Sequence, residues 1–160
     1  MGLKGKIGEL KKGKKNTICD VPGVKVGHVT LSDGVAQTGV TAILPAAGSL
    51  FREKLQAGVS VLNGYGKSVG LVQVEELGTL ESPILLTNTL SVGTALTALV
   101  EYMLEQNPEI GKEAGTVNGV VMECNDGRIN DIRGLRVKKE HALKALHLAS
   151  DEMEEGAVGA

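Results

Sequence analysis

Acidic and amide side chains gather at the end of an apolar stretch near residue 123. Glu123 closes the stretch 115–123, and Asn125-Asp126-Gly127 follows as a strong turn signal. A carboxylate at the end of a buried strand can hold a substrate ammonium group through charge-assisted hydrogen bonds. The alternative is a polar turn whose side chains bond their own backbone, with Glu123 serving that turn. We expect Glu123 to be the recognition residue.

A second candidate is Ser68, because Gly66-Lys67-Ser68-Val69-Gly70 matches the GxSxG nucleophile elbow. A serine hydrolase also needs an acid and a histidine, and the candidates His141 and His147 fall in a charged helical segment. We therefore expect Ser68 to be structural, accepting backbone N–H groups at the start of a helix. A serine hydrolase that uses Ser68 stays open as an alternative.

The histidines and cysteines do not form a metal-binding pattern. His28, His141 and His147 lack a spacing such as HExxH, and Cys19 and Cys124 lack a CxxC pair. We expect no metal and no cofactor, and we interpret His28 as a strand residue with one satisfied ring nitrogen. Two isolated thiols favour a cytoplasmic protein, although a pairing across the fold stays open.

Composition narrows the class of protein further. A length of 160 residues predicts one domain, and one Phe, two Tyr and no Trp leave almost nothing to stack on bases. The net charge of −2 offers no basic field for nucleic acid, and no run of about 18 apolar residues predicts a membrane span. The first fifteen residues, with six lysines, are interpreted as a solvated leader.

Hydrophobic periodicity predicts the elements that position these residues, in an α/β fold. Gly78 is predicted to cap the helix over 67–77. Asp151 and Glu152 lie at the end of the predicted helix 138–153, where a negative charge opposes the helix dipole. We therefore expect a compensating group outside this helix. The predicted strands are 24–31, 38–45, 57–64, 83–87 and 115–123, and the predicted helices are 67–77, 90–104 and 138–153.

Four motifs together resemble the L-aminopeptidase/D-amidase/esterase family, which includes β-peptidyl aminopeptidases and nylon-oligomer hydrolases. They are DVPGVKVGH at 20–28, NGYGKSVG at 63–70, TNTLSVGT at 87–94 and ECNDG at 123–127. The resemblance covers residues 16–160 in order. It divides the chain into a lysine-rich leader, 1–15, and the N-terminal portion of an aminopeptidase domain, 16–160.

The resemblance implies an αββα layered sandwich, of which this chain is the first part. It also implies a precursor that cleaves itself, so that a new N-terminal Ser or Thr attacks an amide or ester bond next to a free amino group. The nucleophile is expected downstream of Ala160. This chain is then an inactive α-subunit-like portion whose partners are a nucleophile-bearing portion, a small peptide, amide or ester substrate, and further copies in a homo-oligomer.

The same resemblance assigns substrate-binding positions residue by residue. Glu123 matches the carboxylate that grips the substrate amino group. Asn125 stands where the family often has tyrosine, and Arg128 stands where an aromatic residue is common, which puts substrate preference in doubt. Tyr65, in the glycine-rich loop, lines the site or is a half-buried loop tyrosine. A noncatalytic remnant or amine-binding subunit is the alternative function.

Overall fold

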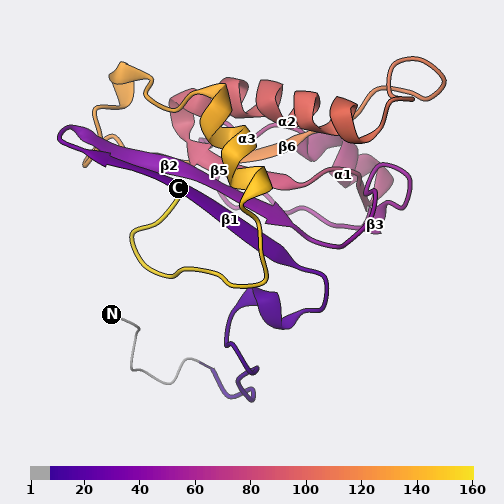
Figure 1. The fold of residues 1–160 in the computed structure, drawn as a ribbon, viewed down its shortest axis with the longest axis horizontal. Coiled ribbons are helices and arrows are strands. Elements are labelled where there is room, and N and C mark those ends of the chain that lie inside the picture. Colours follow the sequence, from indigo (N-terminus) through magenta and orange to yellow (C-terminus); the bar gives the residue numbers. More distant parts are fainter. Residues whose placement is uncertain (1–7) are drawn as a thin grey trace.

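The computed structural model describes residues 8–160 and contains a four-stranded sheet with the order β1-β2-β5-β6 (Figure 1). β1 pairs with β2 and β2 with β5 in antiparallel fashion, whereas β5 and β6 are parallel. A separate two-stranded sheet joins β3 to β4. The strands are β1 (Lys25–Asp33), β2 (Ala36–Leu44), β3 (Leu55–Gln56), β4 (Thr79–Leu80), β5 (Ile84–Asn88) and β6 (Val120–Cys124).

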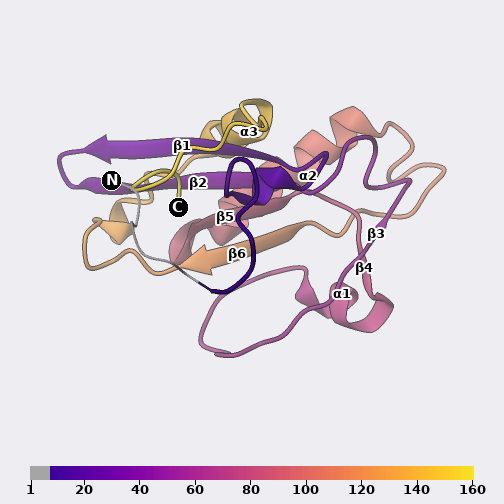
Figure 2. The same ribbon diagram turned by 90° about the horizontal axis from the view of Figure 1, so that it is seen from below.

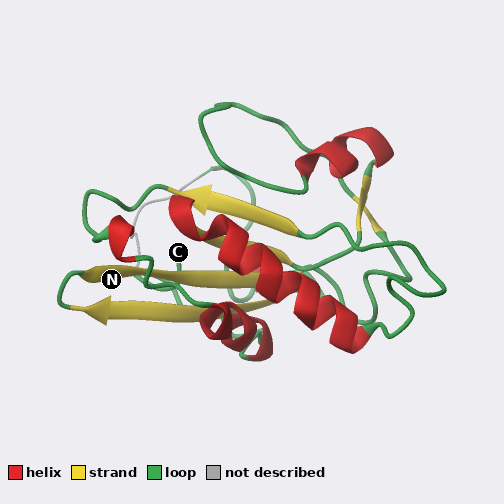
Figure 3. Cartoon of the chain, turned by 90° about the horizontal axis from the view of Figure 1, so that it is seen from above, coloured by secondary structure: helices red, strands yellow, loops and turns green. Residues whose placement is uncertain are grey.

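Two helices, α2 (Val92–Gln106) and α3 (Lys139–His147), cover one face of the large sheet (Figure 3). Alanines at positions 95, 98, 142 and 145 are fully buried between the helices and the sheet. Their small side chains let the helices approach closely, as dense core packing requires. The strands contribute alternate residues to this core, as expected for a period of two: Val29, Val40, Leu85 and Val121.

The opposite face of the sheet is covered only in part. α1 (Leu71–Leu77) packs Val74 with Leu80 and Val120 at the start of β6. The terminal segments cross this side of the molecule, below β1 and β2 in Figure 1 and in front of them in Figure 2. Between these covers Met122 remains 38% exposed. Short 3₁₀ turns complete the elements: η1 (Ile18–Asp20), η2 (Thr89–Ser91) and η3 (Ile132–Gly134).

Several predicted elements differ from the structure. The strand predicted over 57–64 is wrong: this segment is an irregular surface loop in which Leu62 is fully exposed. Its apolar residues mimic a strand pattern, but residues 57–64 pair with no strand. β6 begins only at Val120, and α3 ends at His147 rather than at 153.

The predicted start of α1 and the capping role of Ser68 are also wrong. α1 begins at Leu71, and its N-cap is Gly70, whose φ of 84° is left-handed. A Cβ on Gly70 would lie 2.2 Å from the Gly119 carbonyl oxygen. The close approach of this distant segment therefore requires glycine at position 70, directly before the helix begins. Val69 instead pairs with Val121 at the edge of β6. The predicted cap at Gly78 is confirmed, with its N–H donating to the Val74 carbonyl.

Asp151 and Glu152 lie beyond α3, which ends at His147, so the predicted conflict with the helix dipole is wrong, but they do have a partner outside the helix. Lys15 Nζ lies 2.6 Å from Asp151 Oδ2 and 3.2 Å from Glu152 Oε1. The hydrogen bond to Asp151 raises the pKa of Lys15, and the same contact lowers the pKa of Asp151. The N-terminal segment is therefore tied to the chain that follows α3. No helix within residues 8–160 combines the length and apolar character that a membrane crossing requires.

Candidate active site

A cavity of about 430 Å³ lies at the end of the sheet where β5 and β6 both finish. The carboxyl ends of parallel strands are the usual location of ligand sites in α/β folds. Four parts of the chain line it: the β1–β2 end, Asn88 at the end of β5, the end of β6 with the loop after it, and residues 156–160. Its polar lining comes from Thr30, Ser32, Gln37, Thr38, Asn88, Asn125, Asp126 and Arg128.

Glu123 is half-buried near the end of β6. It is not among the residues that line this cavity, whereas the two residues after it, Cys124 and Asn125, are. Its Oε1 accepts a hydrogen bond from the Lys67 N–H at 3.2 Å, and its Oε2 accepts one from the Thr89 hydroxyl. A carboxylate offers about four acceptor positions. Two neutral donors therefore fix its orientation and leave capacity for a further, charged donor.

The turn after Glu123 is closed by Asn125 rather than by Glu123. Asn125 Oδ1 accepts from the Gly127 N–H at 3.0 Å, which is the Asx arrangement expected of this turn. The alternative in which Glu123 itself serves the turn is wrong, since its two hydrogen-bond donors lie in the Lys67 loop and η2. Asn125 and Arg128 both line the cavity.

The glycine-rich loop contacts Glu123 through its backbone rather than through Tyr65. The Tyr65 ring is 78% exposed, so it is not a half-buried tyrosine, and it is absent from the cavity lining. Lys67 Nζ lies 3.8 Å from the ring centroid and also donates to the Tyr65 carbonyl. The loop is held against the sheet by the Lys67 N–H on Glu123.

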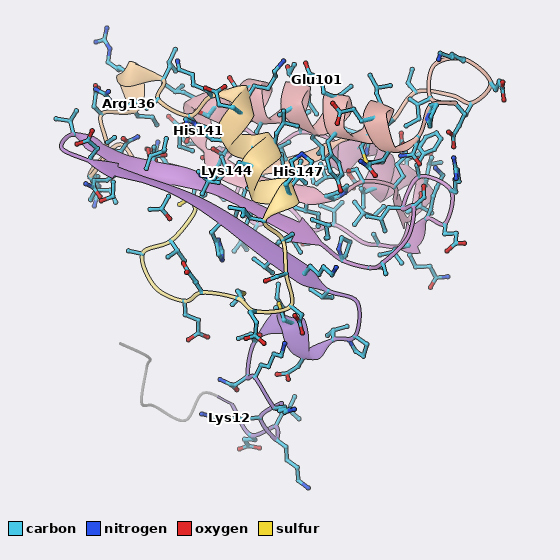
Figure 4. All side chains as sticks on the ribbon, in the orientation of Figure 1. Lys12, Glu101, Arg136, His141, Lys144 and His147 are labelled. Carbon is cyan, nitrogen blue, oxygen red and sulfur yellow. The ribbon has the colours of Figure 1, made fainter. Side chains whose placement is uncertain are left out.

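Ser68 has no histidine beside it. Figure 4 shows His141 and His147 on α3, across the sheet from the terminal segments. Each histidine is engaged elsewhere: His28 Nδ1 with Thr41, His141 Nδ1 with the Lys138 N–H, and His147 with the Tyr102 ring. Within residues 8–160 a Ser68 triad is therefore not assembled, and the interpretation of His28 as a strand residue with one satisfied ring nitrogen is confirmed.

Two residues of the 87–94 motif support the site, and the sequence assigned them no role. Asn88 is buried; its Nδ2 donates to Thr38 Oγ1 at 2.8 Å and its Oδ1 accepts from the Ser91 N–H at 3.1 Å. This amide caps η2, which in turn carries the Thr89 hydroxyl to Glu123. The signal that could have revealed them is a polar Thr-Asn-Thr run directly after a buried strand.

A second carboxylate lies at the opposite end of β6 and was also missed. Glu81 is only 4% exposed; it accepts from Lys54 Nζ and, at 2.7 Å, from the Asn118 N–H. Burial raises the pKa of Glu81, but the Lys54 and Asn118 hydrogen bonds outweigh it, so the net pKa lies below the usual range. Glu81 is thus a paired structural charge.

Metal-type clusters are absent from the described part of the chain. No group of three or more His, Cys, Asp or Glu side chains is placed to share an ion among residues 8–160. The two cysteines are free thiols, with Cys19 buried and Cys124 exposed at the end of β6. The polar groups that line the cavity are hydroxyl, amide, carboxylate and guanidinium groups.

The sequence of residues 16–160 matches peptidase family S58. The chain belongs to this family. Among curated proteins, a β-peptidyl aminopeptidase, BapA, of Sphingosinicella microcystinivorans is 39% identical to this chain. The alignment covers 93% of this chain and 39% of the relative. The predicted relationship to the aminopeptidases is confirmed.

Solved structures agree with the S58 assignment. The PH0078 protein from Pyrococcus horikoshii OT3 has 55% identity and a TM-score of 0.94, covering 97% of this chain and 46% of that one. The L-aminopeptidase D-Ala-esterase/amidase from Ochrobactrum anthropi has 31% identity and a TM-score of 0.83, covering 93% and 44%. That enzyme is described as a prototype of the serine aminopeptidases and a variant of the Ntn hydrolase fold.

These matches confirm the predicted fold class for the S58 chain, a mixed α/β arrangement of the Ntn hydrolase type. The chain spans less than half the length of each of these proteins. The activity of such a longer protein therefore enters only as a proposal.

Proposed function

We propose that this chain is the α-subunit-like, N-terminal portion of an aminopeptidase or amidase that hydrolyses small peptides, amides or esters next to a free amino group. A complementary portion, produced by self-cleavage, supplies the Ser or Thr nucleophile, and the complete units form a homo-oligomer. Family membership over residues 16–160 and the similarity to aminopeptidases support the type of reaction proposed.

The observation that carries the proposal is the arrangement around Glu123. An aminopeptidase must distinguish a free amine from a blocked one, and a carboxylate does so by a charge-assisted hydrogen bond. Glu123 is held by an N–H and a hydroxyl but has no cationic side chain within salt-bridge distance among the described residues. Its negative charge is therefore left for the substrate ammonium group.

The remaining candidates take supporting roles in this proposal. Asn125 uses Oδ1 in its own turn, so its amide N–H groups are what it offers to a substrate oxygen. Tyr65, exposed in the loop that Glu123 holds, is an outer contact for the substrate beyond its amino group. Once the ammonium is held, the Ser or Thr hydroxyl of the complementary portion attacks the adjacent carbonyl carbon, and its proton passes to the amine or alcohol that departs. Water then hydrolyses the acyl-enzyme, which releases the acid and restores the hydroxyl, and a donor stabilises the oxyanion in both steps.

Glu123→Gln in the full-length, self-cleaved enzyme tests the proposal. We expect an activity loss of about 10- to 100-fold on an amino-acid p-nitroanilide with a free amine, because one partner of a charge pair is removed. An N-acetylated ester should lose much less, and mass spectrometry should show unchanged self-cleavage. Equal losses on both substrates would contradict amine recognition by Glu123.

A further inference from the structure

Residues 156–160, here named the strap, lie directly on the outer face of β1 and β2. The Gly159 N–H donates to Thr30 Oγ1 at 2.8 Å, and the Ala160 N–H donates to Thr41 Oγ1 at 3.2 Å. The hydroxyl oxygens of two threonines on adjacent strands thus accept hydrogen bonds from two successive backbone N–H groups. The last stretch of yellow chain in Figure 1 returns to the sheet at this place.

Glycines on both sides make this close approach possible. A Cβ on Gly39 of β2 would lie 2.3 Å from the Gly159 carbonyl oxygen. A Cβ on Gly159, whose φ is +64°, would lie 2.1 Å from Thr41 Oγ1 and 2.6 Å from His28 Nδ1. Any side chain at either position would separate the strap from the sheet, so the fit is specific to a glycine pair.

His28 lies beneath this contact and acts on it through Thr41. His28 and Thr41 face each other across the β1–β2 ladder, and His28 Nδ1 lies 2.9 Å from Thr41 Oγ1. His28 Nε2 is buried without a hydrogen-bond partner among the described residues, so a proton there would be an unsatisfied donor. We therefore assign the ring proton to Nδ1, which donates to Thr41 Oγ1 and fixes this oxygen so that it accepts the Ala160 N–H with its other lone pair.

The strap is also a wall of the cavity at the end of β5 and β6. All five of its residues line this cavity, as do Asn125 and Arg128. We propose that Thr30, Thr41 and His28 anchor the strap as the fixed wall of the substrate cavity, with His28 as a positioning residue that acts through Thr41. This inference rests on the proposed function, because the cavity is taken as the place where substrate binds.

Amide hydrogen exchange on this chain tests the anchoring directly. In the wild type the Gly159 and Ala160 N–H groups should exchange more slowly than the Ala157 N–H. Thr30→Val should accelerate exchange at Gly159, and Thr41→Val or His28→Phe should accelerate it at Ala160. Thr30→Ser and Thr41→Ser keep the hydroxyl and should restore protection. Equal exchange in the Val and Ser variants would overturn the anchoring.

Kinetics of the full-length enzyme test the role in substrate binding, with an amino-acid p-nitroanilide as the probe. Thr41→Val should raise KM about three- to tenfold, as expected for the loss of one neutral hydrogen bond, with kcat within about twofold. Thr41→Ser should return KM to the wild-type value. A kcat loss with unchanged KM, or no change, would overturn the cavity-wall role. A wild-type enzyme without hydrolytic activity would instead overturn the proposed function, and the cavity-wall role with it, while exchange still decides the anchoring.

Discussion

A carboxylate lies at each end of β6, Glu81 beside its start and Glu123 near its end, and the two carboxylates are held in different ways. At the start of the strand Glu81 is buried and paired with Lys54 and with the Asn118 N–H. Asn118 Nδ2 also donates to the Gly70 carbonyl at 2.9 Å, so three segments are tied together there. At the far end Glu123 is half-buried and held by the Lys67 N–H and the Thr89 hydroxyl.

This difference indicates that the charge of Glu81 stabilises the fold, whereas the charge of Glu123 can bind a ligand. A carboxylate that has a cation and a backbone donor in a buried site has its charge compensated within the protein. A half-buried carboxylate oriented by neutral donors keeps an uncompensated charge, at the cost of little desolvation. The comparison therefore predicts stability effects at the start of β6 and binding effects at its end.

The largest expected effect on stability is that of Gly70→Ala at the start of β6. The new Cβ would lie 2.2 Å from the Gly119 carbonyl oxygen, and the residue would have to keep a φ of +84°. We expect the free energy of unfolding to fall by about 2–4 kcal/mol in urea denaturation.

The matched control for that change is Gly66→Ala at the other end of the strand. A Cβ there would lie 3.6 Å from Glu123 Oε1, which is ordinary contact, so we expect a change of less than about 0.5 kcal/mol. If both alanine variants lost the same stability, the tight and open ends of β6 would not differ as described.

Glu81→Ala should be the next largest effect. The Asn118 N–H would lose its acceptor and Lys54, whose side chain is 39% exposed, would lose its counter-ion. We expect a loss of about 2–3 kcal/mol in the free energy of unfolding. Glu123→Ala should cost less than about 1 kcal/mol, because its two donors can turn to water. A Glu123 variant as unstable as the Glu81 variant would make Glu123 a structural charge.

Acid should weaken the start of β6 first. The pKa of Glu81 is held below its usual value of 4.5, so its contribution to stability is present above that pH and is lost as pH falls through the lowered folded-state pKa. Denaturation of the wild type and of Glu81→Gln between pH 7 and 3 should show a constant gap above about pH 5.5 that narrows below about pH 4.5. A gap independent of pH would refute the role of the ionised carboxylate.

A small change in stability is expected of Thr89→Val, which removes one of the two donors that orient Glu123. The unfolding free energy should change by less than about 1 kcal/mol, because the freed oxygen of the half-buried carboxylate can be hydrated. In the full-length enzyme KM for a free-amino substrate should rise, whereas KM for an N-acetylated ester should not. Thr89→Ser, which keeps the hydroxyl, is the control for both measurements.

Elements with strong local patterns could be predicted from the sequence. β1, β2, β5 and α2 were predicted within a few residues, because alternation or helical spacing of apolar residues is set by the face that is buried. The start of α1 could not be predicted, since Gly70 takes its conformation from a contact with Gly119.

The candidate site shows the same division. The position of Glu123 at the end of a strand could be predicted from the apolar run before it. Its partners could not, because Thr89 and Lys67 are 34 and 56 residues away along the chain. The pairing of Lys54 with Glu81 was missed for the same reason, as no local pattern encodes a contact between segments that only tertiary packing brings together.

The hydrogen bonds that hold the terminal segments in place also bear on the order in which parts of the chain fold. β1 and β2 meet across a turn in which Asp33 pairs with Ala36, so this hairpin can form early from local contacts. Lys15 and Asp151 are 136 residues apart, and Thr41 and Ala160 are 119 apart, so these loops close late. A partly folded chain with the hairpin but without these long-range contacts would therefore have β1 and β2 paired before its cavity is complete, and would expose the β1–β2 surface that the strap later covers.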